Sequence, residues 1–67
     1  MIVDTTLAGH VLHGKSGAYK VAGQDIGGRV WAHPCSRTGR IEDERLVELR
    51  PDDWSQLERI LALRVRR

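Results

Sequence analysis

The sequence predicts an α+β fold: a small, strongly bent antiparallel β-sheet or partial barrel of the OB or SH3-like kind, closed on one side by one C-terminal α-helix. Short stretches of alternating apolar and polar residues, separated by glycine-containing turns, indicate the sheet. A change from strand to helix periodicity near Trp54 indicates the helix. Because 67 residues have room for only one core, residues 1–67 are expected to form a single small domain.

The first part of the chain predicts an edge strand and a hairpin. Residues 1–4 are expected to form an edge strand or a loose end. Residues 7–13 and 18–21 have strand patterns, and the turn between them, residues 14–17, contains two glycines that allow positive φ at little cost. Together these segments predict a β-hairpin.

Two further strands are expected before the helix. After a second turn region, residues 22–28, the third strand covers residues 29–33. Pro34 is expected to end that strand because proline cannot donate to a ladder. A polar loop, residues 35–40, follows, and residues 45–49 form a short strand that leads directly into the helix.

The helix signal begins just after the last strand. Pro51 fits the first turn of a helix, where Asp52 and Asp53 place negative charge favourably. Asp53 and Gln56 also have the spacing of a capping box. An apolar stripe then covers an arc of about 140°, formed by Trp54, Leu57, Ile60, Leu61 and Val65. A helix of roughly 12 residues is marginal alone in water, so this stripe is expected to pack on the sheet.

Three aromatic residues are the large anchors available to the core, since the chain contains no Phe. Trp54 leads the helical stripe, and Trp31 is expected in the core under the helix. For Tyr19 the pattern leaves a core position and an exposed position equally open.

Composition also limits the environment of the chain. The single cysteine, Cys35, excludes an internal disulfide framework. No apolar run is long enough to span a membrane, and no signal peptide is evident. We therefore expect a cytoplasmic location and no association with a membrane.

The formal net charge of +2 hides an uneven distribution of cations. One group lies near the C-terminus and consists of Arg59, Arg64, Arg66 and Arg67. Another group lies in or beside polar loops and consists of Lys15, Lys20, Arg37 and Arg40. One interpretation is a solvated surface with cations that favour the C-terminal end of the helix dipole. The other is a basic surface for nucleic acid or for an acidic protein.

Residues 9–16 match the phosphate-binding pattern G-x-x-x-x-G-K-[ST] letter for letter. That motif requires a helix to begin at the Lys-Ser pair and a parallel sheet around it. Here Gly17 follows at once and a strand pattern resumes, so the segment is predicted to be a hairpin turn.

Four side chains could supply nitrogen and sulfur ligands to a structural zinc: His10, His13, His33 and Cys35. His10 and His13 have opposite parity on a strand, and no pair has zinc-finger spacing. We therefore expect no metal and no other cofactor.

Cys35 and His33 could also form a nucleophile and its base. The triplet His33-Pro34-Cys35 has no evident acid to orient the histidine and no evident oxyanion hole. So short a chain also has little room for a pocket. Cys35 is instead expected to be a small apolar filler, and the chain is expected not to be an enzyme.

Aromatic and basic residues on neighbouring strands favour binding of nucleic acid. Tyr19 could stack on bases while cations neutralise phosphates. The candidate binding residues are Lys15, Tyr19, Lys20, Arg37 and Arg40.

Several short motifs occur in an order similar to that of a known family. Gly9-His10-Val11, Ala18–Val21, Gly28–His33 and Val47–Asp53 resemble the small OB-fold RNA-binding proteins of the bacterial translation-initiation-factor-one type, over about residues 8–61. The resemblance implies RNA as the ligand, with Lys15, Tyr19, Arg37 and Arg40 as matching exposed residues. In that family a strand that closes the barrel follows the last of these motifs. In this chain the corresponding residues, 55–62, have helical periodicity. The sequence is therefore compatible with two architectures, a closed barrel and an open SH3-like sheet with a helix.

Two functional hypotheses follow from different classes. The first is a non-enzymatic nucleic-acid-binding module that prefers RNA to DNA. The alternative is a small protein-interaction module that binds and modulates or inhibits a larger host or viral complex, since its mixed charge suits a protein partner. The chain is expected to be a monomer or a weak homodimer, the dimer joined through an edge of Leu57, Ile60 and Leu63.

Overall fold

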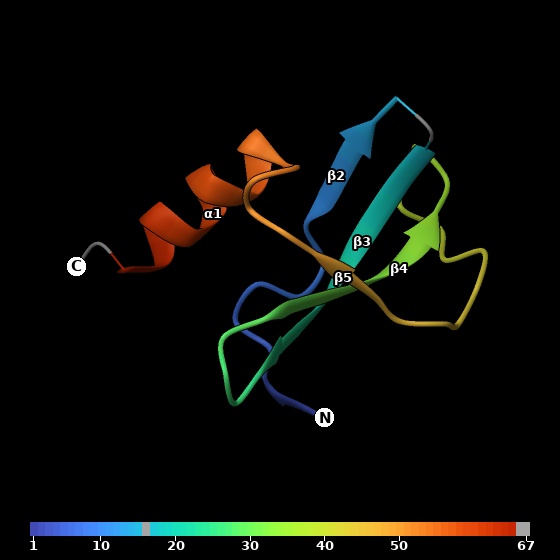
Figure 1. The fold of residues 1–67 in the computed structure, drawn as a ribbon. Helices are drawn as coiled ribbons and strands as arrows, with labels where there is room; N and C mark the ends of the chain where they lie inside the picture. The colour runs from blue at the N-terminus through green and yellow to red at the C-terminus, as the bar shows by residue number, and fades with distance from the viewer. Residues whose placement is uncertain (16, 66–67) are drawn as a thin grey trace.

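The computed structural model contains a five-stranded antiparallel sheet and one short helix (Figure 1). It describes the backbone of residues 1–15 and 17–65, and the side chains of residues 1–15 and 17–62. The elements are β1 (Ile2–Asp4), β2 (Val11–Gly14), β3 (Gly17–Asp25), β4 (Val30–Cys35), β5 (Val47–Leu49) and α1 (Ser55–Val65). The predicted α+β class is confirmed, and over the described residues the sheet does not close into a barrel. No helix in this part of the chain is long and apolar enough to cross a membrane.

The long strand β3 is the centre of the sheet. β4 pairs with one edge of β3 over most of its length, so β2 and β1 share the other edge, and β5 extends the sheet beyond β4. The register from Val11↔Lys20 to Gly14↔Gly17 confirms the predicted hairpin. Within the phosphate-loop pattern, Gly9 and His10 precede β2, residues 11–14 form β2, and β3 begins at Gly17, as the hairpin prediction requires.

A bulge at Gly23 lets β3 continue where a turn was expected. The β3–β4 register shifts between Val21 and Gly23, whose φ is +152°. A Cβ on Gly23 would lie 2.5 Å from Cγ2 of Ile2 and 2.6 Å from the carbonyl oxygen of Asp4. The predicted turn over residues 22–28 therefore starts too early: the glycine serves a bulge and the close approach of β1, β3 ends only at Asp25, and the turn follows from Ile26.

Pro34 does not end its strand, contrary to the prediction, because β4 runs to Cys35. The carbonyl oxygen of Pro34 accepts a hydrogen bond from the N–H of Glu42. In an antiparallel strand the N–H and C=O of one residue point to the same side. The missing N–H of Pro34 therefore faces away from β3, and no bond of the β3–β4 ladder is lost.

Two other strands are shorter than expected. Residues 6–9 form turns that place Leu7, which is buried, in the core, so β2 begins only at Val11. Arg45 lies outside β5, because its N–H and its guanidinium both contact the carboxylate of Asp43, at 2.9 and 3.6 Å.

The core lies between one face of the sheet and α1. Its buried residues are Leu7, Leu12, Val21, Val30, Ala32, Leu49 and Leu57, with Tyr19, Trp54, Ile60 and Leu61 partly buried against them. Leu57 is 0% exposed, so it cannot line the expected dimer seam. The side chain of Leu63, also named for that seam, lies outside the described residues.

Trp31 lies on the opposite face of β4 from Val30 and Ala32 and is only half-buried, so the prediction that it belongs to the core is wrong. Its indole N–H donates to Oδ2 of Asp25 at 3.1 Å. Oδ1 of the same carboxylate accepts from the backbone N–H groups of Gly27 and Arg29. Asp25 thus holds the β3–β4 turn and the Trp31 ring together.

The helix begins later than the sequence suggested. Pro51 lies in a turn before α1, where the N–H of Asp53 donates to Arg50 and that of Trp54 donates to Pro51. The carbonyl oxygen of Trp54 accepts from Leu57 at 2.9 Å, so Trp54 is the N-cap. The predicted capping box of Asp53 and Gln56 is wrong, because the side chain of Gln56 binds a strand instead.

Two contacts attach the start of α1 to β2. The amide of Gln56 donates to the carbonyl of His13 at 3.0 Å and accepts from its N–H at 3.2 Å. The ring of Trp54 lies over Gly14 and meets Tyr19 edge-on, with 5.5 Å between ring centroids. Gly14 is needed here for space, because a Cβ would lie 2.7 Å from Cη2 of Trp54.

Gly14→Ala is therefore expected to force Trp54 and α1 away from the sheet. We expect the free energy of unfolding to fall by about 1–3 kcal/mol, the usual cost of overpacking. Urea unfolding followed by tryptophan fluorescence measures it. Gly27→Ala is the matched control, since a Cβ there meets nothing closer than Oδ1 of Asp25 at 3.4 Å. Equal destabilisation by the two variants would contradict the packing argument.

A second prediction concerns Asp25 and pH. The hydrogen bond from Trp31, helped by those from Arg29 and Gly27, holds the pKa of the Asp25 carboxyl below its ordinary value of 3.8. A lowered folded-state pKa means that the carboxylate stabilises the fold above that ordinary value, and that this stability is lost as pH falls through the lowered pKa. Asp25→Asn should melt at a lower temperature than the wild type at neutral pH. The gap between the two melting temperatures should narrow in acid, and a gap independent of pH would count against this role.

Candidate nucleic-acid interface

Lys15 and Arg37, two of the five predicted binding residues, lie together in the structure. Lys15 is at the tip of the β2–β3 hairpin, and Arg37 is in the loop after β4, which passes beside that tip (Figure 1). Both line a hollow of about 240 Å³ with His13, Gly14, Gly17 and Ala18. The tertiary fold thus brings two cations from separate turns to one place, next to an imidazole.

The loop that carries Arg37 is a tight hydrogen-bonded turn. The N–H of Ser36 donates to the carbonyl of Arg40 at 2.8 Å, and the N–H of Gly39 donates back to Ser36 at 3.0 Å. The hydroxyl of Ser36 accepts from the N–H of Arg40 and shares a hydrogen bond with the hydroxyl of Thr38. Gly39 also lies against Val11 of β2. These contacts fix the backbone on both sides of Arg37.

The cations of this region make no ion pair with the acids among the described residues. Over the described residues the one ion pair joins Arg45 and Asp43, so Lys15, Lys20, Arg37 and Arg40 make none. Lys20 is half-buried opposite His33 in the β3–β4 register, and Arg40 is exposed in the loop. Neither lines the hollow shared by Lys15 and Arg37. The side chains of Arg64, Arg66 and Arg67 lie outside the described residues.

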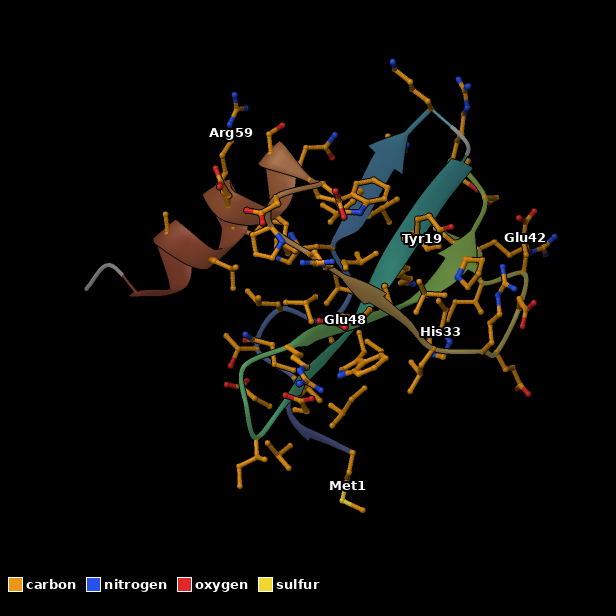
Figure 2. All side chains as sticks on the ribbon, in the orientation of Figure 1. Met1, Tyr19, His33, Glu42, Glu48 and Arg59 are labelled. Carbon is orange, nitrogen blue, oxygen red and sulfur yellow. The ribbon has the colours of Figure 1, made fainter. Side chains whose placement is uncertain are left out.

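Tyr19 is not a freely exposed ring. It is half-buried on the core face of β3 (Figure 2). Trp54 packs edge-on against it. Of the two positions that the sequence left open, the structure places Tyr19 nearer the core, with part of the ring at the surface.

Sequence reasoning missed Trp54 and His13 as surface groups of this region. A second hollow, of about 340 Å³, is lined by His13, Gly14, Lys15, Asp53, Trp54, Ser55 and Gln56. The helical period places Trp54 in the apolar stripe, which predicts a core role alone. The available signal was its position at the polar start of that stripe, between Asp53 and Ser55.

The geometry gives little support to the two other kinds of site considered from the sequence, a zinc site and a cysteine nucleophile. Over the described residues no group of three or more His, Cys, Asp and Glu side chains could hold a metal ion. His33 contacts the carbonyl of Arg45 through Nδ1 at 3.1 Å. Cys35 is buried, and burial, followed by the nearby Glu42 carboxylate, raises the pKa of its thiol. A buried thiol of raised pKa is a poor nucleophile, which fits the expected filler role.

Comparison with known proteins adds no identity to this geometry. No family model, no curated protein and no solved structure matches the chain.

Proposed function

We propose that this protein is a non-enzymatic nucleic-acid-binding module that prefers RNA to DNA. The observation that carries the proposal is the convergence of Lys15 and Arg37 on one hollow, with neither cation paired to an acid in the described part of the chain. The motif resemblance to small OB-fold RNA-binding proteins supports RNA as the ligand. An open, five-stranded antiparallel sheet is also compatible with an OB or SH3-like architecture, which we propose for it.

The binding surface in this proposal is the hairpin tip and the loop of residues 36–40. Lys15 and Arg37 neutralise adjacent phosphates and release counterions, which favours association. Because hydrogen bonds already order the loop around Arg37, less conformational entropy is lost on binding. Arg40 and Lys20 extend the positive field beyond the hollow, which Tyr19 does not line.

A salt titration tests this mechanism. For a single strand, the logarithm of the binding constant falls with the logarithm of salt concentration by about 0.7 per phosphate neutralised. Lys15→Ala and Arg37→Ala should each weaken binding of a single-stranded RNA and reduce that slope by about 0.7. Fluorescence anisotropy of a labelled RNA measures both quantities, and a DNA of the same sequence tests the preference for RNA.

Arg59→Ala is the matched control for charge. Arg59 is exposed on α1 and points away from the sheet, so its loss removes one positive charge at a distance from the hairpin tip (Figure 2). For Arg59→Ala, the slope of the logarithm of the binding constant against the logarithm of salt concentration should equal that of the wild type. The proposal fails if binding is absent or insensitive to salt, or if all three variants lose affinity equally.

A second candidate function, a protein-interaction module that modulates or inhibits a larger host or viral complex, is favoured by the opposite end of β3. Val3 and Ile26 are 61% and 93% exposed and line a hollow of about 260 Å³. Gln24 borders the same hollow, and its buried Oε1 has no hydrogen-bond partner over the described residues. Exposed apolar side chains around a buried acceptor are more typical of a protein contact than of a phosphate contact.

A pull-down separates the second function from the first. Partners retained after nuclease treatment but lost in Ile26→Ser would support a protein contact at this end. Leu46→Ser is the control, because Leu46 is also exposed, at 46%, but lies beside β5. Partners lost on nuclease treatment would instead favour the nucleic-acid function.

A further inference from the structure

We propose that the second hollow, beside Trp54, binds one unpaired nucleobase, while the phosphate next to that base lies between Lys15 and Arg37. This inference rests on the proposed function and specifies it further: the ligand is a single strand whose base leaves the stack. It differs from stacking on Tyr19, because the aromatic group is the first residue before α1 rather than a strand residue.

The two hollows are adjacent. They share His13, Gly14 and Lys15, so the hairpin tip is a wall common to both. Beyond that wall one hollow has Arg37, whereas the other has Asp53, Trp54 and the first residues of α1. A nucleotide that reaches over the tip can therefore place different groups in the two hollows.

Charge decides which group enters which hollow. The Asp53 carboxylate borders the hollow beside Trp54 and repels a phosphate there. Lys15 lines both hollows, but on the other side Arg37 adds a second cation, and no acidic residue among those described lines that hollow. The phosphate is thus directed to the Arg37 side, and the uncharged base to the Trp54 side.

Trp54 has the features of a base-binding residue. Its six-membered ring lies over Gly14 and its position is fixed by the edge contact with Tyr19. Its indole N–H has no hydrogen-bond partner among the described residues, whereas that of Trp31 donates to Asp25. Because Trp54 is only half-buried, both its aromatic surface and a free donor remain for a ligand.

The other groups of this hollow divide into fixed walls and free polar atoms. Both amide atoms of Gln56 are engaged by the backbone of His13, so Gln56 shapes the hollow. The carboxylate of Asp53 makes no hydrogen bond in the described part of the chain and can accept from an exocyclic amino group. The volume of about 340 Å³ is at the lower end of the range of small-ligand sites, roughly 300–1,000 Å³, and suits one base.

The experiment compares three labelled RNA ligands of equal length on the wild-type chain: a single strand, the same strand with abasic sugars, and a duplex. All carry the phosphates that Lys15 and Arg37 bind, but only the first offers an unpaired base. The single strand should bind roughly 5- to 150-fold more tightly than the abasic strand, since stacking of one base on an aromatic side chain has that effect. The duplex should resemble the abasic strand.

A fluorescence signal assigns the base to its hollow. In Trp31→Phe, Trp54 is the only tryptophan, and its emission should be quenched by the single strand and unaffected by the abasic strand. If Trp31→Phe does not fold, the affinity comparison on the wild-type chain still decides the matter. Asp53→Ala should strengthen binding of the abasic strand, because it removes the charge that keeps phosphate out of this hollow.

The possible results separate the two proposals. Equal affinity for the single strand, the abasic strand and the duplex overturns the base pocket but leaves phosphate binding at Lys15 and Arg37 intact. Quenching of Trp54 by the abasic strand also overturns the pocket. No binding of any ligand at low salt overturns the proposed function and the pocket with it.

Discussion

The contact between the start of α1 and the β2 edge is the constraint on which the remaining structure depends. A helix of 11 residues has little stability alone, and here its start is held by three residues. Trp54 lies over Gly14, Gln56 pairs with the backbone of His13, and Leu57 is fully buried in the core. The pairing with Gln56 also satisfies backbone groups of an edge strand that would otherwise invite pairing with another chain.

β3 makes this arrangement possible because one strand supports both ends of the molecule. At its first half it pairs with β2, which carries the helix contact, and at its last residues it pairs with β1. The bulge at Gly23 separates these two regions, and the Asp25 carboxylate then closes the turn into β4 while holding Trp31 on the outer face. The β2–β3 hairpin therefore belongs to a sheet in which β3 is paired along both of its edges.

The candidate interface follows from that geometry. The turn after β4 folds back on itself and rests against Val11, which places Arg37 beside Lys15. The same hairpin tip borders the first turn of α1, so a basic hollow and an aromatic hollow share one wall. The hollows differ in charge, because Lys15 is joined by Arg37 in one and by Asp53 in the other, and this difference suggests a ligand with an anionic part and an uncharged, planar part.

The sequence by itself determined the α+β class, the hairpin around Gly14–Gly17 and the apolar stripe of the helix, because strand and helix periods and glycine turns are local signals. It also selected Lys15 and Arg37 as candidates. Only the tertiary structure decided that Gly23 forms a bulge, that Pro34 stays within β4, that Trp31 faces outward, and that Gln56 binds His13 rather than capping its helix. Each of these depends on which residue lies across from it in space. Local spacing shows which side chains of a strand point to the same face. The pairing of distant segments decides which face of the sheet is covered and which cations lie close together.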